Sequence, residues 1–92
     1  MAANNIRTVF KYTLLLQDKQ TLQLPIGAHV LDVQLQHGNI SLWALVDPDA
    51  ERETRTFVIV GTGHEFTATS TIHIATIQSV AGQLVWHVFE IP

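Results

Sequence analysis

The most informative stretch of this chain is Ser41-Leu42-Trp43-Ala44-Leu45-Val46-Asp47-Pro48. It is an apolar run long enough to form a strand, and it ends in an aspartate and a proline, which favour turns. Apolar side chains occupy both alternating sets of positions in this run. We therefore expect a strand that is covered on both faces, either at the centre of a sheet or at an interface.

The rest of the chain repeats this alternation between strands and turns. Turn-forming residues recur about every 8 to 12 residues, as in all-β sandwiches and barrels. The expected strands are 7–16, 21–24, 29–36, 40–46, 55–60, 72–80 and 84–91. No apolar stripe with a helical period interrupts them, so no substantial helix is expected.

The connections between these strands are predicted from their composition. Residues 47–54 read as a charged loop, 65–71 as extended backbone or loop, and 81–83 as the turn of a final hairpin. In the strand 29–36, regular alternation places Leu31, Val33 and Leu35 together on one buried face. We predict one all-β domain over 1–92, an antiparallel sandwich or partly closed barrel of about seven strands, with 1–6 a candidate for disorder.

Length and composition limit the size of the core and the kind of partner. A chain of 92 residues buries only about 60 to 65% of its unfolded surface, which suits a single domain. Apolar residues make up 47% and charged residues 14%, against about 25% charged in an ordinary soluble domain. Apolar surface is therefore left for a partner, and we expect a homo-oligomer.

Charge and cysteine content exclude several classes of protein. The absence of cysteine rules out disulfides, thiolate zinc sites and a cysteine nucleophile. A net charge of −3 with five Lys and Arg argues against nucleic-acid binding. No secretory signal and no apolar run of membrane-spanning length is found, so a cytoplasmic protein without membrane contact is expected.

The segment Gly61-Thr62-Gly63-His64 comes closest to a functional motif. Two glycines after a strand allow backbone N–H groups to converge on an anion, and His64 adds a titratable donor. The alternative is a strand-to-strand corner that needs positive φ twice. A nucleotide pocket also needs a stacking surface and a cation, for which the chain offers Trp43, Trp86, Arg52 and Arg55.

The remaining candidate residues are acidic or imidazole side chains. Alternating carboxylates at 47, 49, 51 and 53 lack the spacing of an EF-hand and read as a solvated hairpin loop. The five histidines are dispersed without metal-ligand spacing, and His87 is predicted to be a partly buried, hydrogen-bonded residue of the last strand. No catalytic residue, metal or cofactor is predicted. The expected interface residues are Trp86, Phe89, Asp49 and Glu51.

Three blocks of the chain carry a resemblance to a known family. They are Leu42-Trp43-Ala44-Leu45-Val46-Asp47-Pro48, Gly61-Thr62-Gly63-His64 and Val85-Trp86-His87-Val88-Phe89-Glu90, with Lys11-Tyr12 near the front. In this order they resemble a family of small uncharacterised proteins of bacteriophages and prophages. The resemblance implies a setting but no mechanism, because that family carries no established activity. The setting matters because small phage accessory proteins often bind and disable a host component.

The sequence as a whole therefore leads to a ranked expectation of function. The first is a non-catalytic accessory protein in the host cytoplasm that captures a host component, with a nucleotide-like anionic immune signal as the favoured ligand. The second is a protein inhibitor of a host defence complex, for example of a CRISPR complex, acting through the acidic loop and an exposed β edge. The third is a structural or virion-assembly protein.

Overall fold

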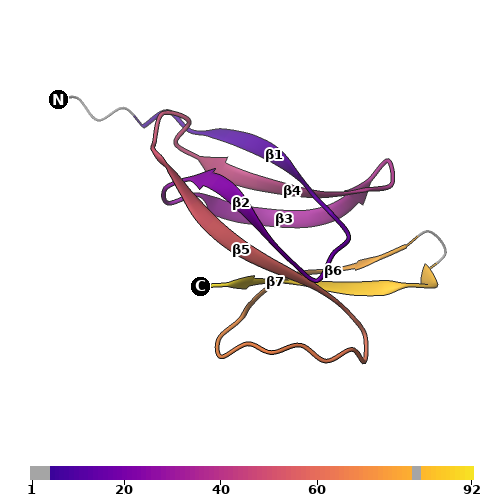
Figure 1. Ribbon diagram of the computed structural model, residues 1–92. Helices are drawn as coiled ribbons and strands as arrows, with labels where there is room; N and C mark the ends of the chain where they lie inside the picture. The colour runs from indigo at the N-terminus through magenta and orange to yellow at the C-terminus, as the bar shows by residue number, and fades with distance from the viewer. Residues whose placement is uncertain (1–4, 80–81) are drawn as a thin grey trace.

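The computed structural model describes residues 5–79 and 82–92, and these residues form seven strands and no α-helix. The strands are β1 (Thr8–Leu14), β2 (Lys19–Pro25), β3 (His29–Gln36), β4 (Asn39–Val46), β5 (Arg52–Gly61), β6 (Ile72–Gln78) and β7 (Val85–Ile91). All strand pairs are antiparallel, in one sheet of order β1-β4-β3 and another of order β2-β5-β7-β6. This confirms the predicted all-β sandwich, in which the sheets form two layers (Figure 1).

The core lies between these two sheets and is built from alternate residues of each strand. The largest fully buried apolar side chains include Leu24, Val33, Leu42, Phe57 and Val88. Both sheets contribute to this set, so neither sheet buries its apolar face without the other. The edge strands β3 and β6 also approach each other across the layers.

Strand β4 occupies the central position that its sequence predicts, because β1 and β3 pair with it on either side. Its inward residues Leu42, Ala44 and Val46 are buried in the core. On the outer face Ser41 is fully buried, whereas Leu45 is 40% exposed. The second apolar face of β4 is therefore only partly covered within one chain.

Two connections are shorter than the sequence predicts. Strand β5 begins at Arg52, so the predicted loop 47–54 ends at 51, and β2 already begins at Lys19. The physical reason is the β2–β5 ladder, which continues to the pair Pro25–Arg52. Pro25 is tolerated there because it closes an edge strand.

At the final hairpin, Ser79 O accepts a hydrogen bond from Gly82 N at 2.8 Å, while positions 80 and 81 lie outside the described residues.

The predicted alternation in β3 is wrong at Leu31. The β3–β4 register shifts between Val30 and Asp32, which marks a β-bulge at this point. A bulge puts two successive residues on the same side of the strand. Here Leu31 and Asp32 share the outer side. Val30 and Val33 therefore face the core, while Leu31 is 49% exposed on the outer face.

An ion pair joins the two central strands of the larger sheet inside the sandwich. The Arg55 guanidinium donates from Nε and Nη2 to the two carboxylate oxygens of Glu90, at 2.6 and 2.9 Å. Its Nη1 donates to the backbone oxygen of Ala28 at 2.6 Å. The side chains are only 17% and 11% exposed, so these bonds replace much of the water that the charges would otherwise hold.

The ion pair also keeps Arg55 charged. The hydrogen bond that Arg55 donates to the Glu90 carboxylate raises the pKa of Arg55 above its ordinary value, against the opposing effect of burial. A raised pKa means that the folded state holds this proton more tightly than the unfolded chain does. While Glu90 carries its charge, the contribution of Arg55 to stability is therefore fully present below the ordinary arginine pKa, and it is lost as the pH rises through the raised value.

We predict that Arg55→Met lowers the free energy of unfolding by about 3 kcal/mol, because it leaves Glu90 as a buried carboxylate without its partner. The double variant Arg55→Met with Glu90→Leu should lose less free energy of unfolding than the sum of the losses in the two single variants. Urea denaturation of the three variants measures the coupling. The exposed Arg52→Met is the matched control, and a loss no larger than in this control would contradict the prediction.

Candidate functional site

The segment 61–64 forms a tight turn at the end of β5. His64 N donates to Gly61 O at 3.0 Å, and Thr62 N donates to Val85 O at 3.3 Å. Gly63 has a φ of +85°, in the left-handed region that favours glycine. Two N–H groups that an anion-binding loop would use therefore already have acceptors within the chain, and this geometry supports the alternative of a β corner. Of its two glycines only Gly63 has a positive φ, so the expectation of positive φ at both is wrong at Gly61.

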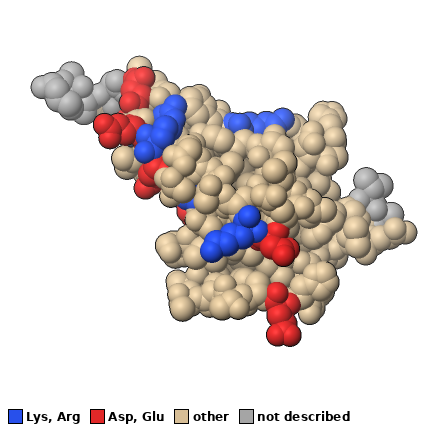
Figure 2. Space-filling model, in the orientation of Figure 1, with Lys and Arg blue, Asp and Glu red and all other residues tan. Residues whose placement is uncertain are grey.

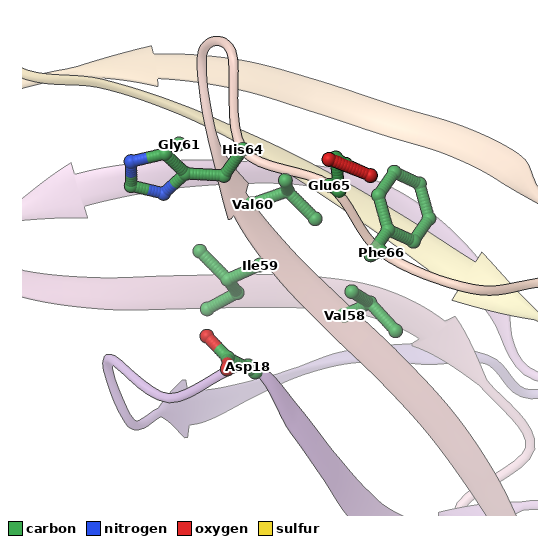
Figure 3. A pocket seen from close by; sticks show the side chains of 8 residues that line it. All are labelled: Asp18, Val58, Ile59, Val60, Gly61, His64, Glu65 and Phe66. Carbon is green, nitrogen blue, oxygen red and sulfur yellow. The ribbon is translucent and has the colours of Figure 1, made fainter.

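The His64 ring lies close against Gly61. A Cβ on Gly61 would lie 3.0 Å from Nδ1 of His64, so a larger residue would have to displace the ring. His64 borders a hollow of about 350 Å³ whose lining also includes Asp18, Glu65 and Phe66. Figure 3 shows side chains of β5, among them Val60, between Asp18 and the segment that carries His64. An apolar floor with a polar rim is thus present beside the turn.

Trp86 links this hollow to its neighbours at the same end of the sandwich. The indole is partly buried and packs against the core. It lines three further hollows of about 200, 330 and 220 Å³, and His64 lines the first two of them. Leu16 and Leu84, which border these hollows, are 62% and 57% exposed. We define the Trp86 end as Leu15, Leu16, Asp18, Gly61, Thr62, His64, Leu84 and Trp86.

The charged side chains at the Trp86 end and in the hollow next to it are carboxylates. Asp18 and Glu65 line the hollow beside His64. The described residues that line these four hollows include no lysine or arginine. Carboxylates without a cation repel an anionic ligand and attract a basic one. The electrostatics therefore favour an apolar group next to a positive charge as the bound chemistry.

The structure does not bring the predicted cations to the Gly61 turn within one chain. Arg55 lies six positions before Gly61 on β5, about 20 Å at the strand rise, and its donors are taken by Glu90 and Ala28. Arg52 lies at the far end of β5, where its Nη1 donates to Ala50 O at 2.8 Å. Trp43 belongs to the other sheet. A pocket that joins these side chains to His64 would need a second chain.

The acidic positions lie at the end of β5 that is remote from Gly61. The carboxylate of Asp47 accepts a hydrogen bond from the Asp49 backbone at 3.1 Å. The backbone oxygen of Glu51 accepts one from Ile26 at 2.7 Å, and both Asp49 and Glu51 are exposed. These contacts are typical of a solvated turn. Figure 2 shows that charged side chains cover only a small part of one face of the molecule.

Phe89 and His87 lie on the outer face of the larger sheet, beneath the segment 62–71. This segment is the wide orange loop between β5 and β6 in Figure 1. The centroid of its Phe66 ring lies 5.3 Å from that of Phe89. The His73 ring packs edge-to-face against Phe89, with the two centroids 5.4 Å apart. Phe89, predicted as an interface residue, is therefore partly covered by its own chain.

A chain of hydrogen bonds that the sequence did not reveal runs across the same face. Thr62 Oγ1 lies 2.7 Å from His87 Nε2, and Thr76 Oγ1 lies 3.0 Å from both His87 Nδ1 and His73 Nε2. His87 is partly buried, so its predicted role as a hydrogen-bonded strand residue is confirmed. Thr62, His87 and Thr76 stand in the order of a nucleophilic hydroxyl, its imidazole base and the group that orients the base. Thr76, however, is a neutral group that gives an imidazolium no charge stabilisation.

The sequence does contain a signal for the Trp86 end. Leu15 and Leu16 come directly before the turn at Gln17 and Asp18, and Leu84 follows the turn at Gly82. Large apolar residues at turn positions have little opportunity for burial within a chain, so they indicate a contact surface.

The described part of the chain holds neither a metal-binding cluster nor a membrane-spanning helix. Within 5–79 and 82–92, no group of three or more His, Cys, Asp or Glu side chains is placed to hold a metal ion. The same residues contain no helix that is long and apolar enough to cross a membrane.

Comparison with known proteins assigns the chain to a family. The fold and the Trp86 end define a small β-sandwich with an apolar, acidic-rimmed end. A family model described as "Domain of unknown function (DUF7352)" matches residues 5–92, and the chain belongs to this family. No curated protein and no solved structure matched the chain.

We predict that Gly63→Ala lowers the free energy of unfolding by about 1 to 2 kcal/mol, because alanine is strained at positive φ. Gly61→Ala should cost less and should instead move the His64 ring, since the new methyl group meets the end of that side chain. Urea denaturation together with the imidazole NMR signals of His64 checks both expectations. Equal destabilisation with an unmoved His64 signal would contradict them.

Proposed function

We propose that this protein is a non-catalytic binding protein that captures a segment of a partner polypeptide at the Trp86 end. The observation that carries the proposal is the position of Leu15, Leu16 and Leu84. These leucines come from two separate turns, are largely exposed, and border hollows that Trp86 lines. Apolar side chains around an aromatic floor are the usual centre of a protein–protein contact.

The charge at this end selects the partner. Asp18 and Glu65 stand next to the apolar surface. A partner segment with a large apolar residue next to Lys or Arg would satisfy both features, because the apolar residue fills a hollow and the cation meets a carboxylate. The apolar contact supplies most of the affinity, and the carboxylates supply selectivity.

The resemblance to phage and prophage proteins gives this proposal a setting. In that setting the partner is a host protein, and the binding protein acts by occupying a surface that the host complex needs. This is the protein inhibitor that the sequence analysis ranks second, but with a different contact surface. The contact surface that we propose is the Trp86 end, while the acidic loop at Asp49 and Glu51 lies at the other end of β5.

Capture of a nucleotide-like anion remains the second candidate. Its specific support is His64, which lies against Gly61 and borders several of the hollows at this end. A base could stack near Trp86 and a phosphate could accept a hydrogen bond from His64. Asp18 in the same lining opposes this ligand, which is why we rank it below a polypeptide.

Selection from a random peptide display library tests the proposal. We expect the enriched peptides to carry a large apolar residue next to Lys or Arg. Leu16→Glu and Leu84→Glu should each weaken their binding at least about tenfold, because each places a charge in the apolar contact. Ile26→Glu is the matched control, since Ile26 is similarly exposed but lies in the β2–β3 connection.

The same protein is also incubated with a nucleotide mixture and examined by native mass spectrometry. Peptides without an apolar and basic pair, or binding that survives Leu16→Glu and Leu84→Glu, would overturn the polypeptide proposal. A nucleotide retained at a fixed ratio and lost in His64→Ala would establish the second candidate instead.

A further inference from the structure

The outer face of the β1-β4-β3 sheet carries a self-complementary set of side chains. The registers place Val9, Leu45 and His29 in one row across the three strands, and Lys11, Trp43 and Asp32 in the next. Thr13, Ser41 and Gln34 form a third row. The bulge in β3 adds Leu31 to the same face. Val9, Leu31 and Leu45 are 49%, 49% and 40% exposed, so apolar surface borders the two charges on the side away from the third row.

The row that contains Trp43 carries opposite charges on its two sides. Lys11 lies on β1 and Asp32 lies on β3, with the indole of Trp43 between them on β4. Adjacent strands are about 4.8 Å apart, so the two charged residues start about 10 Å from each other. Among the described residues, Arg55 and Glu90 form the only ion pair, so neither Lys11 nor Asp32 is paired with an opposite charge inside the chain.

Both charges have polar partners within the chain. The Asp32 carboxylate accepts a hydrogen bond from Val33 N at 2.8 Å and another from Gln34 Nε2 at 2.9 Å. The Lys11 ammonium donates to Gln36 Oε1, which takes one of its three donors. Because Gln36 is two strands away from Lys11, this bond passes over β4 close to the fully buried Ser41. The surface near Trp43 and Leu45 remains available to a partner.

We propose that this face is the interface between two copies of the chain, related by a two-fold axis that runs along β4. Such an axis leaves each row at the same height and exchanges its two sides. The backbone position of Lys11 in one copy then lies opposite Asp32 of the second copy, and the Lys11 ammonium exchanges Gln36 Oε1 for that carboxylate. The reverse pair forms on the other side. Trp43 and Leu45 each lie opposite the same residue of the second copy. This is an isologous interface, in which one patch complements itself.

The distances between packed sheets agree with this arrangement. Two sheets that stack face to face lie about 10 Å apart, a gap that a lysine and an aspartate side chain can span from opposite sides. A two-fold axis perpendicular to the strands would instead place Lys11 opposite β1 of the second copy, without a carboxylate in the facing position. Charge complementarity therefore selects the axis along β4.

The dimer that this interface forms is a weak one. Three strands of about seven residues cover a small area compared with the roughly 800 Å² per partner of a stable complex. The dimer leaves the β2-β5-β7-β6 sheet uncovered, and the Trp86 end is not part of the interface. If the proposed capture function also holds, one dimer presents two capture ends, which raises the avidity for a partner with repeated segments. The interface itself does not depend on that function.

Charge exchange provides the test. Sedimentation velocity over a concentration series up to about 1 mM, the weak end of the affinity range, should show the wild-type chain passing from monomer to dimer. Lys11→Glu and Asp32→Lys should each weaken dimerisation at least about tenfold, because each puts like charges opposite one another. The double variant Lys11→Glu with Asp32→Lys should regain the dimer, since both reciprocal pairs form again with reversed sign.

Lys19→Glu is the matched control, because Lys19 is exposed on the other sheet and should not change dimerisation. Circular dichroism and urea denaturation verify that each variant is folded. The double variant lacks the Lys11–Gln36 bond as the first single variant does, so regained dimerisation cannot come from that bond. A wild-type chain that stays monomeric, single variants that dimerise as the wild type does, or a double variant that stays monomeric would overturn the proposal.

Discussion

The sandwich depends on the guanidinium of Arg55. Its donors join β5, β7 through Glu90, and the β2–β3 connection through the carbonyl of Ala28, where the chain passes from one sheet to the other. A positive charge in this place is tolerated only because its hydrogen bonds are satisfied within the chain. The planar fork of arginine meets these acceptors in a fixed direction, which the single ammonium of a lysine cannot do.

The sequence predicted the strands well because the period-two pattern reflects burial, and burial determines which residues a sandwich hides. It failed where one inserted residue changes the alternation. Leu31 keeps its place in the apolar pattern, yet the bulge turns it outwards, and no local signal near Val30 distinguishes the two outcomes. It also failed at Arg55, which reads as a free cation until Glu90, 35 positions away, is brought beside it.

The candidate site was predicted in part for the same reason. Gly61, His64 and Trp86 do meet at one end of the molecule, as the strand pair β5–β7 requires. Arg52 and Trp43 lie elsewhere, because position along β5 and the choice of sheet are tertiary properties that spacing in the sequence does not carry. The acidic surroundings of His64 come from Asp18, on a different connection, and from Glu65, and they are the reason that we propose a basic segment rather than an anion as the ligand.

The ion pair at Arg55 also bears on how the chain folds. Arg55 and Glu90 are 35 positions apart, and β7 must arrive before the β2-β5-β7-β6 sheet can close. Closing so long a loop costs chain entropy before any contact repays it, so folding is expected to be slow for a chain of this size. Until β7 docks, β5 presents an unpaired edge and an arginine without its carboxylate. Nascent chains at that stage are the ones most exposed to aggregation and to proteolysis.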